Sequence, residues 1–120
     1  MSLTLAGRNQ VLPSLLTGTL YVALHSADPG DAGTNNELTD GNYTRQAVAF
    51  SVDSATGLAS NTSALSFPTL AGAAMVTHIS IKTAATDGTT LVRQPLAAGQ
   101  SFNAAGVPSF AAGAITVGGV

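Results

Sequence analysis

Two histidines are the side chains in this sequence best suited to metal or acid–base chemistry. His25 and His78 each lie in a segment that alternates between apolar and polar residues, which predicts that both project from the polar face of a β-strand. If those strands pair, the two imidazoles approach each other, and two histidines with a loop carboxylate can bind Zn²⁺. Neither histidine belongs to a dedicated ligand spacing, so we expect both rings to make ordinary hydrogen bonds.

Four acidic residues fall in one short segment: Asp28, Asp31, Glu37 and Asp40. Carboxylate oxygens this close in sequence could hold Ca²⁺. Their spacing does not match the EF-hand pattern, which needs acids at alternate positions and a closing glutamate. The tetrapeptide at 28–31, Asp-Pro-Gly-Asp, is typical of a turn, so the segment is predicted to be a solvated polar loop.

No other motif indicates catalysis or cofactor binding. The serines lack the G-x-S-x-G elbow, and the glycine-containing runs 30–33 and 113–119 lack the Lys-Ser/Thr ending of a phosphate loop. The absence of cysteine excludes disulfides and thiolate metal sites. We therefore expect no catalytic residue, no cofactor and no metal site, and we predict that the protein is not an enzyme.

The sequence is unusually poor in charge. Only 8% of its 120 residues are charged, against roughly 25% in an average globular domain. Since mixed surface charge normally keeps a protein soluble, such a chain is expected to hide much of its surface in an assembly. The alternative is a domain that uses hydroxyl groups and glycine for its surface.

Charge and hydropathy also exclude several classes of partner. The net charge is −2, and the four basic residues are scattered, so no basic stripe is present to bind nucleic acid. No apolar run reaches the roughly 20 residues of a membrane span. The N-terminus lacks the pattern of a secretory signal. The glycosylation-like patterns at Asn42 and Asn61 are therefore interpreted as chance matches in loops.

The apolar pattern predicts one short helix followed by about seven short strands. Val11 and several leucines at helical spacing predict a helix over 7–17, capped near Asn9 and ended by Gly18, with Pro13 either in its first turn or shortening it. The expected strands cover 19–26, 43–52, 64–67, 75–83, 89–94, 101–103 and 110–117.

Turn-forming residues separate the expected strands. Two long polar segments, 28–42 and 53–63, are predicted to be loops and are candidates for docking or exposure. Asp87-Gly88 predicts a hairpin turn, and Pro95 is expected to end the strand that follows it. Short strands without a second helix favour a single domain over 1–120. We expect an all-β, antiparallel β-sandwich, jelly-roll-like, with one short N-terminal helix.

The segment 21–34, YVALHSADPGDAGT, resembles the "YVALHTADPG…GT" signature of a family of small phage virion proteins. The preceding segment 9–18 is similar to the family's "N-x-L-L-x-x-L-L-G" helix, and 36–48 is similar to its "NE(V/L)…Y-x-R-Q-A-V" pattern. Further landmarks follow in the same order: Asn61-Thr62, Phe67-Pro68, 76–79, 84–88 and 109–114. The resemblance spans nearly the whole chain, although the link at 17–19 is shorter than in relatives.

The resemblance implies a structural protein of a phage particle. Such proteins are commonly labelled tail fibre proteins, and similar small β proteins act as capsid cement in the form of trimers. The expected function is a capsid decoration or cement protein that binds the major capsid protein and copies of itself, as a homotrimer, and stabilises the shell. The alternative is a tail fibre or tail-tip component that contacts tail proteins and takes part in host attachment.

Both hypotheses, capsid decoration and tail fibre, imply a location in the virion, on the capsid exterior or in the tail. The protein would be synthesised in the host bacterial cytoplasm. A carbohydrate-binding module is a third hypothesis. It would need aromatic side chains to line a sugar site. The chain has only two tyrosines and four phenylalanines for this purpose, and it has no tryptophan.

Overall fold

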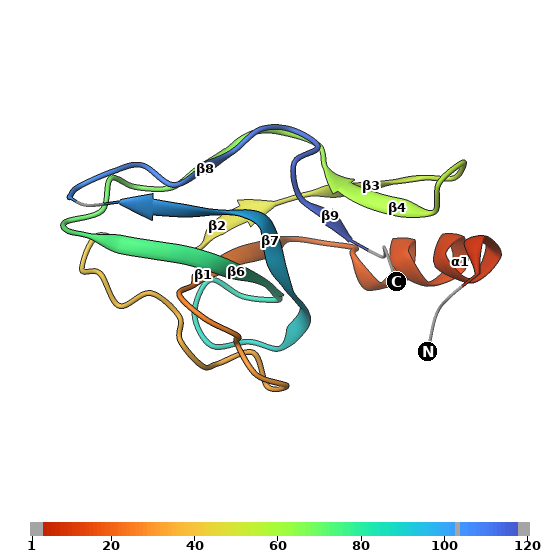
Figure 1. Ribbon diagram of the computed structural model, residues 1–120. Helices are drawn as coiled ribbons and strands as arrows, with labels where there is room; N and C mark the ends of the chain where they lie inside the picture. Colours follow the sequence, from red (N-terminus) through yellow and green to blue (C-terminus); the bar gives the residue numbers. More distant parts are fainter. Residues whose placement is uncertain (1–3, 103, 118–120) are drawn as a thin grey trace.

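The computed structural model describes residues 4–102 and 104–117 and shows a mostly β protein with one helix. Every strand pair is antiparallel, and the molecule measures 44 × 26 × 23 Å (Figure 1). The elements are α1 (Leu5–Leu15), β1 (Leu20–His25), β2 (Gln46–Val48), β3 (Phe50–Asp53), β4 (Leu58–Asn61), β5 (Leu65–Ser66), β6 (Ala74–Lys82), β7 (Thr90–Phe102), β8 (Ser109–Phe110) and β9 (Thr116–Val117). The predicted fold class, antiparallel and all-β with a short N-terminal helix, is confirmed.

The largest sheet has the strand order β2-β1-β6-β7, and its central strand β1 is buried on both faces. Leu20, Val22 and Leu24 face the core, as the alternation predicts. Ala23 and His25, expected on a polar face, are fully buried as well. The reason is that the chain between β1 and β2 folds back over that second face, below β1 and β6 in Figure 1.

The strand predicted over 43–52 is in fact two strands in different sheets. β2 pairs with β1, whereas β3 pairs with β4 in a second sheet of order β3-β4-β9. The chain changes sheets at Ala49, whose carbonyl accepts a hydrogen bond from Thr62 N at 3.0 Å. The segment 53–63, predicted to be a loop, contains β4 and is therefore mostly a hairpin. Its turn ends at Gly57, which has a φ of +66°.

Pro95 does not end its strand, contrary to the prediction. β7 runs for 13 residues from Thr90 to Phe102, and it includes Ser101 and Phe102 of the strand expected at 101–103, whose last residue lies outside the described residues. β7 is an edge strand, where a missing N–H can face solvent. The pairing of β6 with β7 shifts register between Val76 and His78, next to this proline.

The strand predicted over 110–117 divides into β8 and β9, which belong to different sheets. Between them Gly113, with a φ of +79°, reverses the chain. Asn61 holds this reversal in place, because its buried side-chain Nδ2 donates to Ala111 O and its Oδ1 accepts from Ile115 N. Asn61 was expected in a loop, but it is the last residue of β4.

α1 begins earlier than predicted, because Thr4 and not Asn9 is its cap. The Thr4 hydroxyl accepts a hydrogen bond from Gly7 N, the arrangement of a helix N-cap. Pro13 lies in the last turn of the helix, not the first, and the helix ends two residues later. In the described part of the chain, no helix is both long and apolar enough to cross a membrane.

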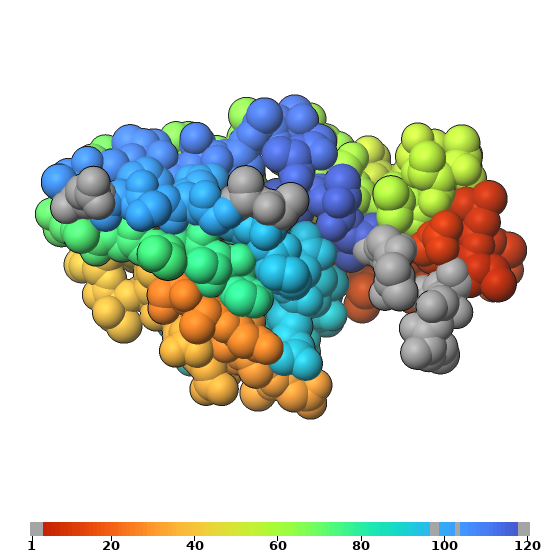
Figure 2. All heavy atoms as spheres, in the orientation of Figure 1, coloured from red at the N-terminus to blue at the C-terminus, as the bar shows by residue number. Residues whose placement is uncertain are grey.

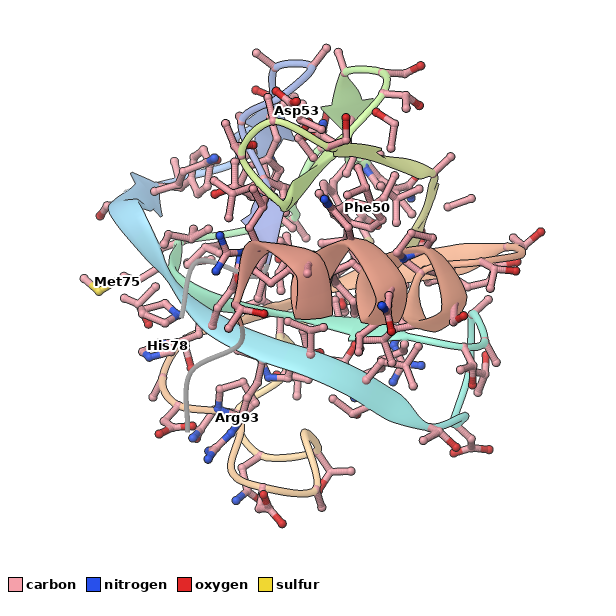
Figure 3. The ribbon with its side chains drawn as sticks, turned by 90° about the vertical axis from the view of Figure 1, so that its right-hand side faces the viewer. Phe50, Asp53, Met75, His78 and Arg93 are labelled. Atoms are coloured by element: carbon pink, nitrogen blue, oxygen red, sulfur yellow. The ribbon has the colours of Figure 1, made fainter. Side chains whose placement is uncertain are left out.

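The core lies between the largest sheet and the smaller sheets, and α1 closes one end of it. Leu12 and Leu16 of the helix region are buried, and Phe50 lies beside α1 (Figure 3). Aromatic contacts join the layers, since the ring of Phe67 stacks on Tyr43 at 6.4 Å and meets Phe110 edge-on at 6.2 Å. One continuous cluster of buried aliphatic and aromatic residues therefore supports all three sheets.

Candidate functional site

The segment between β1 and β2, residues 26–45, includes the predicted loop 28–42, which was a candidate for docking; we call the whole segment the β1–β2 loop. It packs closely on the largest sheet along the lower side of Figure 2. Ser26 N donates to Asn36 O at 2.9 Å, and Leu38 N donates to Leu24 O at 3.0 Å. Glu37 forms an isolated antiparallel bridge with His25. The returning half of the loop thus continues the pairing of β1.

Glu37 is the centre of the polar contacts that hold the loop. Its Oε2 accepts hydrogen bonds from the Tyr43 hydroxyl at 2.6 Å and from Arg45 Nε at 2.8 Å, and its Oε1 accepts from Arg45 Nη2 at 2.9 Å. The Arg45–Glu37 pair is therefore bidentate, the strongest form of this ion pair. Arg45 Nη1 also donates to the carbonyls of Ala84 and Asp87, which ties the loop to the β6–β7 turn.

The electrostatics of this cluster follow from its burial. The side chains of Arg45 and Glu37 are only 11% and 22% exposed. Burial raises the pKa of Glu37, but the hydrogen bonds from Arg45 and Tyr43 outweigh it and hold that pKa below its usual value. Burial and the hydrogen bond to Glu37 raise the pKa of Tyr43, and the hydrogen bond to Glu37 raises the pKa of Arg45. Glu37 is therefore ionised and Tyr43 neutral over a wide range of pH.

His25 forms a second contact beneath the loop. Its Nδ1 lies 2.8 Å from Asn35 O and its Nε2 lies 2.8 Å from Ser80 Oγ. Because a carbonyl only accepts, we assign the proton to Nδ1, and Nε2 accepts from the serine. Burial lowers the pKa of His25, against the hydrogen bond to Asn35, so the ring is neutral at pH 7.

Lys82 forms a third contact and is buried, although the alternation of apolar and polar residues over 75–83 predicts that it shares the polar face of His78. Its Nζ donates to Gly33 O and to Thr90 Oγ1, both at 2.6 Å, and the residue is 1% exposed. Burial lowers its pKa. We refer to Glu37, Tyr43, Arg45, His25 and Lys82 together as the clamp, because each of them fixes part of the β1–β2 loop on the sheet.

The acidic residues considered for Ca²⁺ serve separate parts of the surface. Asp40 accepts hydrogen bonds from the backbone N–H groups of Ala71, Asn42 and Gly72, which lower its pKa. Asp28 accepts from Gly30 N at 2.9 Å and from Arg93 Nη1 at 3.0 Å. Glu37 belongs to the clamp. These three carboxylates therefore do not converge on one position, and the fourth acidic residue, Asp31, is exposed.

The two histidines are opposite each other in the pairing of β1 with β6, as the sequence allowed. His78 Nδ1 lies 2.8 Å from Thr77 Oγ1, and the ring borders an open pocket of about 260 Å³ that also contains Asp28, Arg93 and two prolines. Figure 3 shows His78 and Arg93 on the same side of the molecule. Among the described residues, no three His, Cys, Asp or Glu side chains come together to hold a metal ion.

The contacts of the clamp hold the β1–β2 loop on the sheet. His25 and Ser80 form a serine–histidine pair, but both residues are fully buried, and the other ring nitrogen contacts a backbone carbonyl where a catalytic triad has a carboxylate. The clamp was missed at the sequence level, even though Glu37, Tyr43 and Arg45 stand in the motif that carries the phage resemblance.

The comparison with protein families agrees with that resemblance. Residues 3–118 match the model of the family described as podophage GP4 fiber I protein gp80. The chain belongs to this family. No curated protein matches it. Membership in the podophage fiber I family identifies a phage structural protein, and it confirms the family predicted from the sequence. The clamp is thus a feature of a fiber I family chain.

The first prediction concerns the clamp of this fiber I family protein. Glu37→Gln keeps the shape of the side chain but removes the charge that Arg45 binds. We expect a loss of about 2 kcal/mol of unfolding free energy, since breaking a largely buried ion pair leaves a cation without its counter-charge. Urea denaturation measures the loss.

The matched control is Asp28→Asn, which breaks the exposed pair with Arg93. There the side chains are 69% and 43% exposed, so the expected loss is much smaller than for Glu37→Gln. Equal losses for the two variants would contradict the central role of Glu37.

The second prediction concerns pH. The folded pKa of His25 lies below its ordinary value of 6.5, so the unfolded chain binds more protons in the interval between the two values. The contribution of neutral His25 to stability is complete above 6.5 and decreases as the pH falls from 6.5 toward the folded pKa. Thermal unfolding at a series of pH values measures this slope. His25→Gln should flatten it, and an unchanged slope in that variant would refute the assignment.

Proposed function

We propose that this protein is a non-enzymatic structural subunit of a phage tail fibre. The match of residues 3–118 to a fiber I family carries the proposal. This match supports the hypothesis of a tail fibre component better than the hypothesis of a capsid decoration protein, which was the main expectation from the sequence. The buried clamp adds to the non-enzymatic part of the proposal, because the polar groups best suited to chemistry bond to one another.

The surface composition is consistent with assembly. With 8% charged residues, and with several of those charges inside the clamp, much of the surface is made of small, aliphatic and hydroxyl-bearing side chains. Such surfaces lose little solvation energy when another protein covers them. The partners proposed are other virion proteins. Closed symmetry with copies of itself, including the homotrimer, remains a prediction.

Copy number tests the proposal. Quantitative mass spectrometry of purified particles gives the ratio of this protein to the major capsid protein. A fibre subunit should be present in a few copies for each particle, and antibody labelling should place it on the tail. A ratio near one to one would contradict the fibre role and support the hypothesis of a capsid decoration protein. Complete absence from the particle would overturn both.

A further inference from the structure

The part of the β1–β2 loop over residues 28–36 is closed by hydrogen bonds of its own. Gly33 N donates to Gly30 O at 3.0 Å, and Asn35 N donates to Pro29 O at 3.0 Å. We call residues 28–36 the tip; in Figure 1 it belongs to the orange segment below β1 and β6. Because these bonds do not involve the sheet, the tip can keep its shape when it separates from the sheet.

Two buried side chains of the largest sheet bind the tip. His25 Nδ1 of β1 donates to Asn35 O at 2.8 Å, and Lys82 Nζ of β6 donates to Gly33 O at 2.6 Å. On the outer side, Arg93 of β7 forms an exposed ion pair with the tip, and exposed pairs contribute little to stability. The attachment of the tip therefore depends mainly on His25 and Lys82.

Apolar contacts add little to this attachment. No residue of the tip belongs to the cluster of buried hydrophobic residues that supports the sheets. Pro29 is the one buried side chain of the tip, and a backbone hydrogen bond from Ser26 N to Asn36 O joins the tip to the residue that follows β1. A segment with so few apolar contacts opens at a lower free energy than the core.

The site beneath the tip already holds more positive than negative charge. The charged groups that face His25 are Lys82 of β6 and, in the loop, Glu37 and Arg45. Both oxygens of Glu37 are already bonded, to Arg45 and to the Tyr43 hydroxyl. A second proton on His25 would thus add a third cation beside one carboxylate that is fully occupied. Like charges this close disfavour the protonated ring.

Protonation would also break a hydrogen bond of His25. The neutral ring accepts from Ser80 Oγ at Nε2, whereas an imidazolium has no acceptor. The ring is fully buried, so the closed tip denies it water. Burial accordingly lowers the pKa of His25 from its ordinary value of 6.5. Opening the tip returns that pKa toward 6.5, and acid therefore favours the open form.

His78 provides an internal comparison. It is the partner of His25 in the pairing of β1 with β6, but its ring borders an open pocket that also contains Asp28 and Arg93, and Figure 3 shows it beside Arg93. A proton on His78 would meet water and lie near the carboxylate of Asp28. Its protonation therefore does not favour opening of the tip.

We propose that the tip is a lid that opens when His25 gains a proton at mildly acidic pH, and that opening exposes Ser80, Lys82 and the end of β1. The sheets and the apolar core stay folded in the open form. At neutral pH the ring is unprotonated and the lid is closed. This device goes beyond the proposed function and does not depend on where in the particle the protein lies.

Hydrogen exchange as a function of pH tests the inference on the purified protein. The protection factors of the Ser26 and Asn35 amides are measured from about pH 7.5 to about pH 5, above the ordinary carboxylate pKa values. A protection factor is used because it removes the pH dependence of exchange itself. We expect these protection factors to fall below pH 6.5, by up to about tenfold for each pH unit, the limit for one proton. The amides of β4 should keep theirs.

Two variants assign the effect to one histidine. His25→Gln keeps a donor and an acceptor but does not titrate, so protection of the tip should no longer depend on pH. His78→Gln is the matched control and should behave as the wild type. If His25→Gln does not fold, the NMR signals of the His25 ring in the wild type decide, because the ring must titrate together with the loss of protection.

Three results would overturn the inference: tip protection that does not change with pH, an equal loss of protection in β4, or a loss that persists in folded His25→Gln. A His25 ring that stays neutral while the tip opens would do the same. None of these measurements uses phage particles, so their failure leaves the proposed tail fibre role untouched.

Discussion

The bidentate pair between Glu37 and Arg45 is the interaction on which the surface of this protein depends. It lies where the β1–β2 loop, β1 and the β6–β7 turn meet, and the Tyr43 hydroxyl completes it. The loop that it helps to hold covers the second face of β1, including His25, and the buried side chains of Ser80 and Lys82 in β6. A chain with few charges thus places several of them where they order a loop of about 20 residues.

Burying these charges has a cost that only complete hydrogen bonding offsets. Both oxygens of Glu37 are occupied, and Lys82 and His25 find partners on the loop or the sheet. Polar networks of this kind contribute less to net stability than an apolar core but allow fewer alternative arrangements. Here the network fixes the β1–β2 loop against the largest sheet.

The sequence predicted the fold class, β1, β6 and the turn at Asp87-Gly88 because these depend on local alternation and turn chemistry. It did not predict the division of 43–52 at Ala49, because only long-range pairing decides which sheet each half joins. It placed His25 and Lys82 on a polar face because alternation shows which residues share a face and not what covers it. The clamp contacts residues up to 55 positions apart in the chain, a separation that no spacing rule reaches.

Native-state hydrogen exchange of the β1–β2 loop tests this account most directly. The amides of Ser26 and Asn35 donate within the loop, and that of Leu38 donates to Leu24 O in β1. If the clamp orders the loop, these three amides exchange nearly as slowly as those of β1, and Glu37→Gln accelerates them more than it accelerates the amides of β4. If these amides exchange in the wild-type protein at the rate of an unstructured peptide, the loop is not held by the clamp and the account is wrong.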